Sequence, residues 1–184
     1  MSDLFYVMGA SGAGKDTLFR YARKHISQKA PVVFAHRYIT RGKNPGGENH
    51  IALSEKEFQL RLDNGLFSMH WESHGLFYGI GIEIDMWLKK GLHVVVNGSR
   101  GYLDKALNIY PGLRPVLIRV SPEILERRLR LRGRENEAEI KERLERARAF
   151  EGLKHPRLII IDNNGPIETS GEEFTRIFSE SKFL

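Results

Sequence analysis

The sequence of 184 residues predicts an α/β fold, in which a mainly parallel sheet is flanked by helices. Strand and helix signals alternate along the chain, as they do in βαβ units. A glycine-rich loop, Gly9-Ala10-Ser11-Gly12-Ala13-Gly14-Lys15, joins an apolar run at residues 4–8 to a helical pattern at residues 16–27. That order of strand, loop and helix is the setting of a phosphate-binding P-loop. We therefore predict a P-loop NTPase fold in a single domain, because the length suits one domain and is short for two.

Further strands are predicted from short apolar runs that turn residues bound on both sides. They lie at residues 32–36, 92–96, 114–120 and 158–161. A glycine-rich loop at residues 41–49 follows the first of them. Two more runs, at residues 67–71 and 76–78, flank Gly75, and we interpret them as a small antiparallel excursion.

Start and stop signals place the remaining helices. Ser54-Glu55-Lys56-Glu57 has the spacing of a capping box and predicts a helix that stops at Gly65. Ser121 as N-cap and Pro122 at the first helical position start a helix that ends at Gly133. Other helices are predicted at residues 82–90, 136–150 and 170–182.

The composition of the chain indicates the cellular compartment in which the protein is expected. The chain has no cysteine, which excludes disulfides, thiolate metal sites and a cysteine nucleophile, and which fits a reducing cytoplasm. No apolar run approaches the roughly 20 residues that a membrane span needs. Residues 1–3 lack the basic and apolar regions of a secretion signal. We therefore expect a cytoplasmic protein with no membrane partner.

The charge balance points to acidic ligands. The formal net charge is +6 and the sequence pI is about 9.6. Nucleic acid is one such ligand, but the basic residues between Glu123 and Arg148 alternate with acids instead of forming a block, and no aromatic–basic platform accompanies them. We therefore expect no nucleic-acid partner, since ATP and a small phosphorylated substrate would also attract clustered arginines.

The glycine-rich loop predicts the ATP site. Its glycines allow successive backbone N–H groups to turn inward around a polyphosphate, and the first helix points its positive end at the anion. Lys15 can reach the terminal phosphates. We assign the ATP β- and γ-phosphates to Lys15 and to the backbone of Gly9, Ala10, Ser11, Gly12, Ala13 and Gly14.

The position after the P-loop lysine departs from the usual pattern. Ser or Thr normally stands there and ligates Mg²⁺, whereas this chain has Asp16 followed by Thr17. A carboxylate suits a hard cation that takes oxygen ligands, so Asp16 could ligate Mg²⁺ directly or through water, or Thr17 could take over. Alternatively, Asp16 is a first-turn acid that the helix dipole favours. The predicted cofactors are thus ATP and Mg²⁺.

With this order of elements, nearly the whole chain resembles the guanylate-kinase-type nucleoside monophosphate kinases. The markers are the P-loop, Tyr38-Ile39-Thr40-Arg41, Gly75-Leu76-Phe77-Tyr78-Gly79 and the arginine-rich segment at residues 125–133. The guanine-reading residues of such kinases are replaced here: a tyrosine by His50, an acid by Met69 or His70, and Asp-x-Asp by Asn97-Gly98-Ser99-Arg100. Without those carboxylates, the guanine donors would stay unpaired at a cost of about 1–3 kcal/mol each. The sequence therefore argues against guanylate as the substrate.

The segments that differ from the guanylate-kinase-type pattern resemble another family. They comprise Glu48-Asn49-His50-Ile51-Ala52-Leu53-Ser54, Gly79-Ile80-Gly81-Ile82-Glu83-Ile84-Asp85, Val96-Asn97-Gly98-Ser99-Arg100 and Arg132-Gly133-Arg134-Glu135-Asn136. This set resembles the ribose 1,5-bisphosphate phosphokinases of bacterial phosphonate catabolism, a family that also has Asp after the P-loop lysine. The resemblance implies that ATP and α-D-ribose 1,5-bisphosphate give ADP and 5-phosphoribosyl diphosphate. It also implies a substrate-binding insertion at about residues 36–81 and a helical lid at residues 123–150.

By this resemblance, arginines of the lid close over the transferring phosphoryl group. Arg128 and Arg132 lie four residues apart on a predicted helix and so share one face, and Arg143 follows on the next helix. We predict that these arginines are catalytic together with Lys15. The alternative is a solvated, salt-bridged helix surface, because glutamates intersperse the arginines. Asn163-Asn164 follows the last strand, where related kinases contact adenine.

Basic and aromatic residues near the second glycine-rich loop are candidates for binding substrate. Arg41 falls on a family motif position and, with the nearby Arg37 and Lys43, could hold a substrate phosphate by charge-assisted hydrogen bonds. His50 and Tyr78 are further substrate-binding candidates, although a half-buried packing position suits Tyr78 nearly as well.

A second group of candidates follows a predicted central strand. Asn97, Ser99 and Arg100 lie just past its carboxyl end, where open α/β sheets bind ligands. The amide and the hydroxyl could bond ribose hydroxyls and the arginine a phosphate, or the segment is a polar strand-end turn. Glu83 and Asp85 also suit ribose hydroxyls, although acids in the first turn of a helix are ordinary.

Two rival functions share part of this pattern. A nucleoside monophosphate kinase of altered base specificity would share every feature of the ATP site. A non-catalytic, kinase-like binding module would have commonly lost the P-loop lysine and the lid arginines, whereas Lys15, Arg128 and Arg132 are present.

Overall fold

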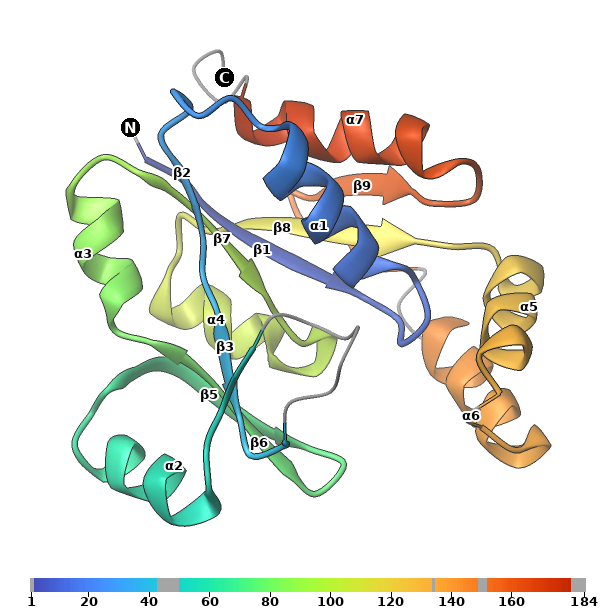
Figure 1. The fold of residues 1–184 in the computed structure, drawn as a ribbon, viewed down its shortest axis with the longest axis horizontal. Coiled ribbons are helices and arrows are strands. Elements are labelled where there is room, and N and C mark those ends of the chain that lie inside the picture. The colour runs from blue at the N-terminus through green and yellow to red at the C-terminus, as the bar shows by residue number, and fades with distance from the viewer. Residues whose placement is uncertain (1, 43–49, 134, 149–151, 180–184) are drawn as a thin grey trace. The chain divides into compact units, whose positions relative to one another are not determined.

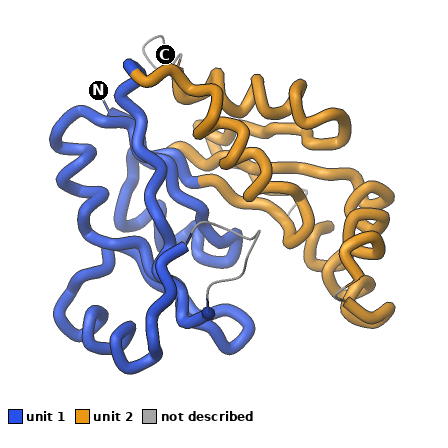
Figure 2. The backbone as a smooth tube through the Cα atoms, in the orientation of Figure 1, with its two compact units in different colours: residues 1–6, 29–113 blue, residues 7–28, 114–184 orange. Residues whose placement is uncertain are grey.

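The structure, a computed structural model, describes residues 2–42, 50–133, 135–148 and 152–179. The chain divides into two compact units (Figure 2). Unit 1 comprises residues 1–6 and 29–113, and unit 2 comprises residues 7–28 and 114–184. Each unit buries apolar side chains, among them Ile39, Ile80 and Val95 in unit 1 and Leu18, Ile118 and Phe174 in unit 2.

A five-stranded sheet has the strand order β2-β7-β1-β8-β9 (Figure 1). Its strands are β1 (Leu4–Gly9), β2 (Val32–Phe34), β7 (His93–Asn97), β8 (Arg114–Arg119) and β9 (Ile159–Asp162). The pairs β2–β7 and β8–β9 are parallel. Neighbouring strands that are not consecutive in the chain require crossover connections, which here contain helices. The predicted α/β fold with a parallel sheet flanked by helices is confirmed.

In unit 2 the helices are α1 (Lys15–His25), α5 (Pro122–Arg132), α6 (Glu137–Arg148) and α7 (Ile167–Ser179). The helices α1 and α7 lie side by side (Figure 1), with the rings of Phe19 and Phe174 5.7 Å apart. The start and stop signals of α5 are confirmed, because the Ser121 hydroxyl accepts from the backbone N–H of Ile124 and Gly133 has φ 63°.

Unit 1 contains a second sheet with the strand order β4-β3-β6-β5. Its strands are β3 (Arg37–Ile39), β4 (His50–Ala52), β5 (Phe67–Ser73) and β6 (Leu76–Gly81). The antiparallel pair β5–β6 is the predicted excursion around Gly75. The helices of this unit are α2 (Glu55–Asp63), α3 (Glu83–Lys89) and α4 (Leu103–Ile109), and a 3-10 turn, η1 (Arg100–Tyr102), precedes the last of them.

In unit 1 the structure shortens one predicted strand and adds elements that were not predicted. The strand predicted at residues 32–36 is present as β2 but is shorter, because β2 ends at Phe34 and the chain then enters the second sheet as β3 at Arg37. The strands β3 and β4 and the helix α4 were not predicted. All three are short, and α4 buries few residues, Leu103 and Ala106 among them, so none of them produces a strong periodic signal.

The helices of the part of the chain that the structure describes include none that is both long and apolar enough to cross a membrane.

The N-cap of α2 can be tested by substitution. Ser54→Ala should lower the free energy of unfolding by about 1 kcal/mol, because the Ser54 hydroxyl accepts a 3.1 Å hydrogen bond from the backbone N–H of Glu57. Urea denaturation measures this loss. Ser54→Asp keeps an acceptor and should retain most of the stability, whereas equal stability of Ser54→Ala and the wild type would contradict the cap.

Candidate functional site

The loop between β1 and α1, which is predicted to bind phosphate, ends in a glycine of left-handed conformation. Gly14, the residue before α1, has φ 89° and ψ 15°, in the left-handed region that favours glycine. A Cβ on Gly14 would also lie 2.5 Å from Nδ2 of Asn163. The positive end of the α1 dipole therefore begins where the loop ends, and only glycine fits the junction.

The Lys15 side chain folds back over this loop. Its Nζ atom donates hydrogen bonds of 2.8 Å to the carbonyl of Gly9 and 3.2 Å to the carbonyl of Ala10. These contacts hold the ammonium group beside the backbone that is predicted to cradle the phosphates.

Asp16 and Thr17 are exposed in the first turn of α1. The Thr17 hydroxyl accepts a 3.5 Å hydrogen bond from Arg20. Proteins usually bind Mg²⁺ through one or two carboxylates together with substrate phosphates and water. A solvent-facing carboxylate next to the phosphate loop, with a hydroxyl beside it, fits this donor set.

Asn163 supports the loop from within unit 2. Its Nδ2 donates a 2.7 Å hydrogen bond to the carbonyl of Ala13, and its Oδ1 accepts a 2.7 Å hydrogen bond from the hydroxyl of Ser170 on α7. Asn163 and Ser170 are only 3% and 2% exposed. Because rotation of this buried amide would leave polar atoms unpaired, it fixes the position of the Ala13 carbonyl.

Arg128 extends from α5 onto the same loop. Its guanidinium donates a 2.9 Å hydrogen bond to the carbonyl of Asn163 and a longer one, of 3.4 Å, to the carbonyl of Ala13. Burial, followed by the charge of the neighbouring Arg127, lowers the pKa of the Arg128 guanidinium. These contacts do not fit the alternative of a solvated surface arginine.

Arg132 and Arg143 meet at one carboxylate. Oε1 of Glu135 pairs with Arg132 and lies 3.4 Å from an Nη atom of Arg143. Arg143 also donates a 2.6 Å hydrogen bond to the hydroxyl of Ser11 in the phosphate loop. The structure thus links each of the predicted lid arginines to the loop, directly or through Glu135.

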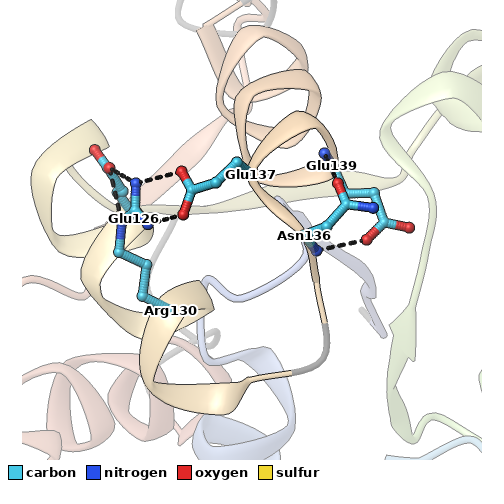
Figure 3. A network of polar contacts seen from close by, with 5 residues as sticks. All are labelled: Glu126, Arg130, Asn136, Glu137 and Glu139. Carbon is cyan, nitrogen blue, oxygen red and sulfur yellow. Dashed lines mark hydrogen bonds and ion pairs between the residues drawn. The ribbon is translucent and has the colours of Figure 1, made fainter.

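Other arginines of α5 and α6 do fit the alternative of a salt-bridged surface. Arg130 pairs with Glu126 at 2.8 Å and also with Glu137 (Figure 3). Arg146 pairs with Glu142 one turn earlier on α6. These side chains are about half exposed, so the two interpretations of the arginine-rich region apply to different residues.

In unit 1, the turn after β7 carries three of the predicted substrate residues. Asn97 is 4% exposed at the carboxyl end of the strand, and Ser99 and Arg100 follow it. The Tyr6 hydroxyl donates a 2.8 Å hydrogen bond to the carbonyl of Ser99 and accepts a 2.9 Å hydrogen bond from the backbone N–H of Ser99. A Cβ on Gly98 would lie 2.1 Å from the Tyr6 ring, so the turn approaches this ring as closely as glycine allows.

His50 supports the backbone at Arg41. Its Nε2 donates a 3.1 Å hydrogen bond to the carbonyl of Arg41, and the imidazole is buried on β4. The structure therefore places His50 and Arg41 together, and their contact with a substrate stays a prediction. Lys43 lies outside the described residues.

Tyr78 belongs to an aromatic stack. Its ring lies parallel to that of Trp71 with centroids 5.5 Å apart, and Trp71 packs against Tyr102 at 5.4 Å. The Arg37 guanidinium lies 5.2 Å from the centroid of Tyr78. This packing role of Tyr78 is the alternative that the sequence left open, and donation to a phosphate stays a prediction.

Glu83 and Asp85, in the first turn of α3, already accept hydrogen bonds from protein groups. Glu83 accepts from the hydroxyl of Tyr38 at 3.3 Å. Asp85 accepts from Tyr110 at 2.6 Å and from Ser68 at 3.2 Å, one with each oxygen. Burial, and then the hydrogen bond to Asp85, raises the pKa of Tyr110. Asp85 thus ties α3 to β5, and contact of either acid with ribose stays a prediction.

Sequence reasoning gave no role to Tyr6, Glu135 or Ser170. Tyr6 lies within an apolar strand run, and Ser170 follows Asn163 by several residues with no motif between them. Of these three residues, only Glu135 could have been found from the sequence, because it lies within a family motif that also contains Arg132.

Comparison with known proteins supplies the family. A protein named ribose 1,5-bisphosphate phosphokinase PhnN from Desulfomicrobium baculatum is 55% identical over 181 residues, 98% of this chain and 96% of that protein. The chain belongs to the ribose 1,5-bisphosphate phosphokinase family. A protein of the same name from Thiobacillus denitrificans is 53% identical over 180 residues, which cover 97% of this chain and 93% of that protein. The resemblance that the sequence motifs indicated is confirmed. No protein-family model matches the chain.

Solved structures agree on the fold. A guanylate kinase from Anaplasma phagocytophilum superposes with a TM-score of 0.70 at 18% identity, covering 100% of this chain and 87% of that one. A sugar kinase from a Janibacter species superposes with a TM-score of 0.53 at 17% identity, covering 98% and 95%. At such identities the likeness concerns the fold alone, and it confirms the predicted P-loop kinase fold.

The Asn163 amide should strengthen ATP binding. Asn163→Ala leaves the Ala13 carbonyl and the Ser170 hydroxyl without this partner, so we expect the KM for ATP to rise about tenfold and the free energy of unfolding to fall by about 1–3 kcal/mol. Steady-state kinetics and urea denaturation measure the two effects. Asn108→Ala, on the exposed side of α4, is the control. An unchanged KM in Asn163→Ala would refute the role of the amide.

Two tyrosines, the buried Tyr6 and the half-buried Tyr110, should make stability fall at alkaline pH. The pKa values of Tyr6 and Tyr110 are raised in the folded protein, mainly by burial, whereas tyrosine in an unfolded chain titrates at about pH 10. Their contribution is therefore complete below about pH 10 and is lost as the pH rises above it. Urea denaturation between about pH 9 and about pH 11 should show a falling free energy of unfolding, and Tyr6→Phe and Tyr110→Phe should each flatten that slope. Equal slopes in both variants and the wild type would contradict the assignment.

Proposed function

We propose that the chain transfers the γ-phosphoryl group of ATP to the C1 phosphate of ribose 1,5-bisphosphate, giving 5-phosphoribosyl diphosphate and ADP. The identity of 55% to a relative of that name, over nearly the whole of both chains, carries the proposal. The contacts of Lys15, Arg128 and Arg143 with one loop support it, because they assemble cations where a polyphosphate would bind.

The acceptor in this reaction is itself a phosphate. One of its oxygens forms a bond to the γ-phosphorus of ATP, while the bond between that phosphorus and the bridging oxygen of ADP breaks. The acceptor oxygen is anionic at neutral pH, so no general base has to remove a proton. The chief obstacle is repulsion between two polyanions, which positive side chains offset.

We assign the donor side of the reaction to unit 2. The backbone of the loop and Lys15 would hold the β- and γ-phosphates, while Arg128, Arg132 and Arg143 would neutralise the charge on the transferring group. Asp16 and Thr17 would hold Mg²⁺. When bound, this ion would offset the negative charge of the phosphates.

We assign the acceptor side to unit 1. Arg41 and Arg100 are the candidates for the sugar phosphates, because guanidinium groups bind phosphate in a bidentate manner. Asn97 and Ser99 are the candidates for the ribose hydroxyls, with the turn that carries them fixed by Tyr6. His50 would act by supporting Arg41.

The organisation of the chain follows from these assignments. We propose one kinase domain, with a substrate-binding insertion at about residues 36–81 and a lid at residues 123–150. Its ligands would be ATP and the phosphorylated sugar, without a nucleic-acid or membrane partner, and its place would be the cytoplasm.

An acceptor panel tests the function. Pure protein with Mg-ATP should release ADP with ribose 1,5-bisphosphate and not with ribose 5-phosphate, GMP or AMP. Lys15→Ala should lower that rate by about 100-fold or more, because it removes a positive charge from the transition state. Coupled measurement of ADP release reads both results.

The alternatives predict different outcomes. Turnover with a nucleotide in place of the sugar would indicate a nucleoside monophosphate kinase of altered base specificity. No turnover with any acceptor would indicate a binding module and would refute the kinase assignment. Lys24→Ala, in the exposed last turn of α1, controls for loss of a lysine elsewhere on the same helix.

A further inference from the structure

The Glu135 carboxylate is buried between two arginines of the lid. Its side chain is only 4% exposed, although it lies in the short connection between α5 and α6. Oε1 is shared by Arg132 and Arg143, and Oε2 is buried without a hydrogen-bond partner in the part of the chain that the structure describes.

This burial sets Glu135 apart from the other paired acids of the lid. The side chains of Glu126, Glu137 and Glu142 are 41%, 76% and 57% exposed, and each of them pairs with an arginine at the surface. Surface ion pairs of this kind contribute little to stability. A buried carboxylate with one unpaired oxygen carries a desolvation penalty, so it is poorly explained as a further stabilising pair.

The contacts of Glu135 lead to the phosphate loop. Arg143 donates to Oγ of Ser11 and lies 3.4 Å from Glu135, which in turn pairs with Arg132. Two guanidinium groups would repel each other without the carboxylate between them. Because a guanidinium has five N–H donors, each arginine keeps donors for a phosphate while it pairs with one oxygen.

We propose that Glu135 is a positioning residue for phosphoryl transfer, which holds the guanidinium groups of Arg132 and Arg143 together beside Ser11 before the phosphates bind. The inference rests on the proposed function, since it assigns these arginines to the transferring group. Glu135 does not touch the reacting atoms and acts through the two arginines.

A charge argument distinguishes positioning from simple support of the fold. Glu135 is an anion next to a site for a polyanion, so its charge opposes ATP binding while its geometry aids transfer. Loss of the charge should therefore lower kcat without weakening the affinity for ATP. A residue that only supports the fold would lower kcat, ATP affinity and thermal stability together.

Glu135→Gln tests this expectation. We expect kcat with ribose 1,5-bisphosphate to fall about tenfold to 100-fold, since a small misplacement of catalytic groups costs factors of this size. The dissociation constant for ATP, measured by calorimetry, should stay equal or decrease. Glu137→Gln is the matched control, because it removes an exposed carboxylate from the same lid (Figure 3) and should leave kcat unchanged.

Two further variants keep the inference falsifiable. Glu135→Asp keeps the charge with a shorter reach and should have a kcat between those of Glu135→Gln and the wild type. In the background of Arg143→Ala, Glu135→Gln should have a much smaller effect than in the wild type, because residues that act as a unit are not additive. A wild-type kcat in Glu135→Gln or Glu135→Asp, or a full and independent effect in the Arg143→Ala background, would overturn the proposal.

NMR of the arginine side chains separates this inference from the proposed function. The guanidinium Nη–H resonances of Arg132 and Arg143, recorded without ribose 1,5-bisphosphate, should shift in Glu135→Gln and not in Glu137→Gln. Failure of the wild type to use the bisphosphate would refute the function, while unshifted resonances in Glu135→Gln would refute the pairing itself.

Discussion

The phosphate loop depends on the hydrogen bond between the Asn163 amide and the carbonyl of Ala13. A loop rich in glycine has little rigidity of its own, because glycine loses more conformational freedom on folding than any other residue. The order of this loop therefore has to come from outside it. Asn163, locked by the buried hydroxyl of Ser170, supplies that order from the end of β9, and Arg128 adds a second donor to the same carbonyl. Because the loop is already ordered, binding of a ligand does not have to include the entropic cost of ordering it.

The lid shows how identical side chains acquire different roles from their neighbours. Arg130 and Arg146 pair with exposed glutamates, where water screens the charges and the pairs contribute little. Arg128 donates to two backbone carbonyls and pairs with no carboxylate of the described residues, so its positive charge is not offset by a paired acid. Arg132 and Arg143 share one buried carboxylate, so this pair keeps a net positive charge. The positive field at the loop therefore comes from a minority of the arginines.

In unit 1 a buried tyrosine fixes a turn in the way that Asn163 does in unit 2. The Tyr6 hydroxyl satisfies both the N–H and the carbonyl of Ser99, and its ring sets the closest approach of Gly98. Burial raises the pKa of this phenol, so it stays neutral and keeps its single proton for donation to Ser99 at any physiological pH. In both units, a buried polar side chain from a strand or its end fixes a turn that carries candidate ligand-binding residues.

The sequence predicted most of the local structure correctly, because local signals encode it. The P-loop needs only a strand, a glycine-rich loop and a helix in order, and the caps at Ser54 and Ser121 depend on neighbours three residues away. The family motifs also indicated the ribose 1,5-bisphosphate phosphokinases, which the identity to relatives confirmed. The strand β3 was missed for a physical reason, since three extended residues give no periodic signal of their own and do not show which sheet they join.

The sequence by itself therefore determined the fold class, the family and the position of the loop. Tertiary structure decided which polar residues serve that loop. Asn163 reaches Ala13 from the end of β9, and Ser170 holds Asn163 from the first turn of α7. Glu135 is buried because α5 and α6 fold against each other. Helical spacing places a residue on one face of its own helix and says nothing about what that face meets. Contacts between residues distant in the chain are set by the packing of whole elements, which no local pattern records.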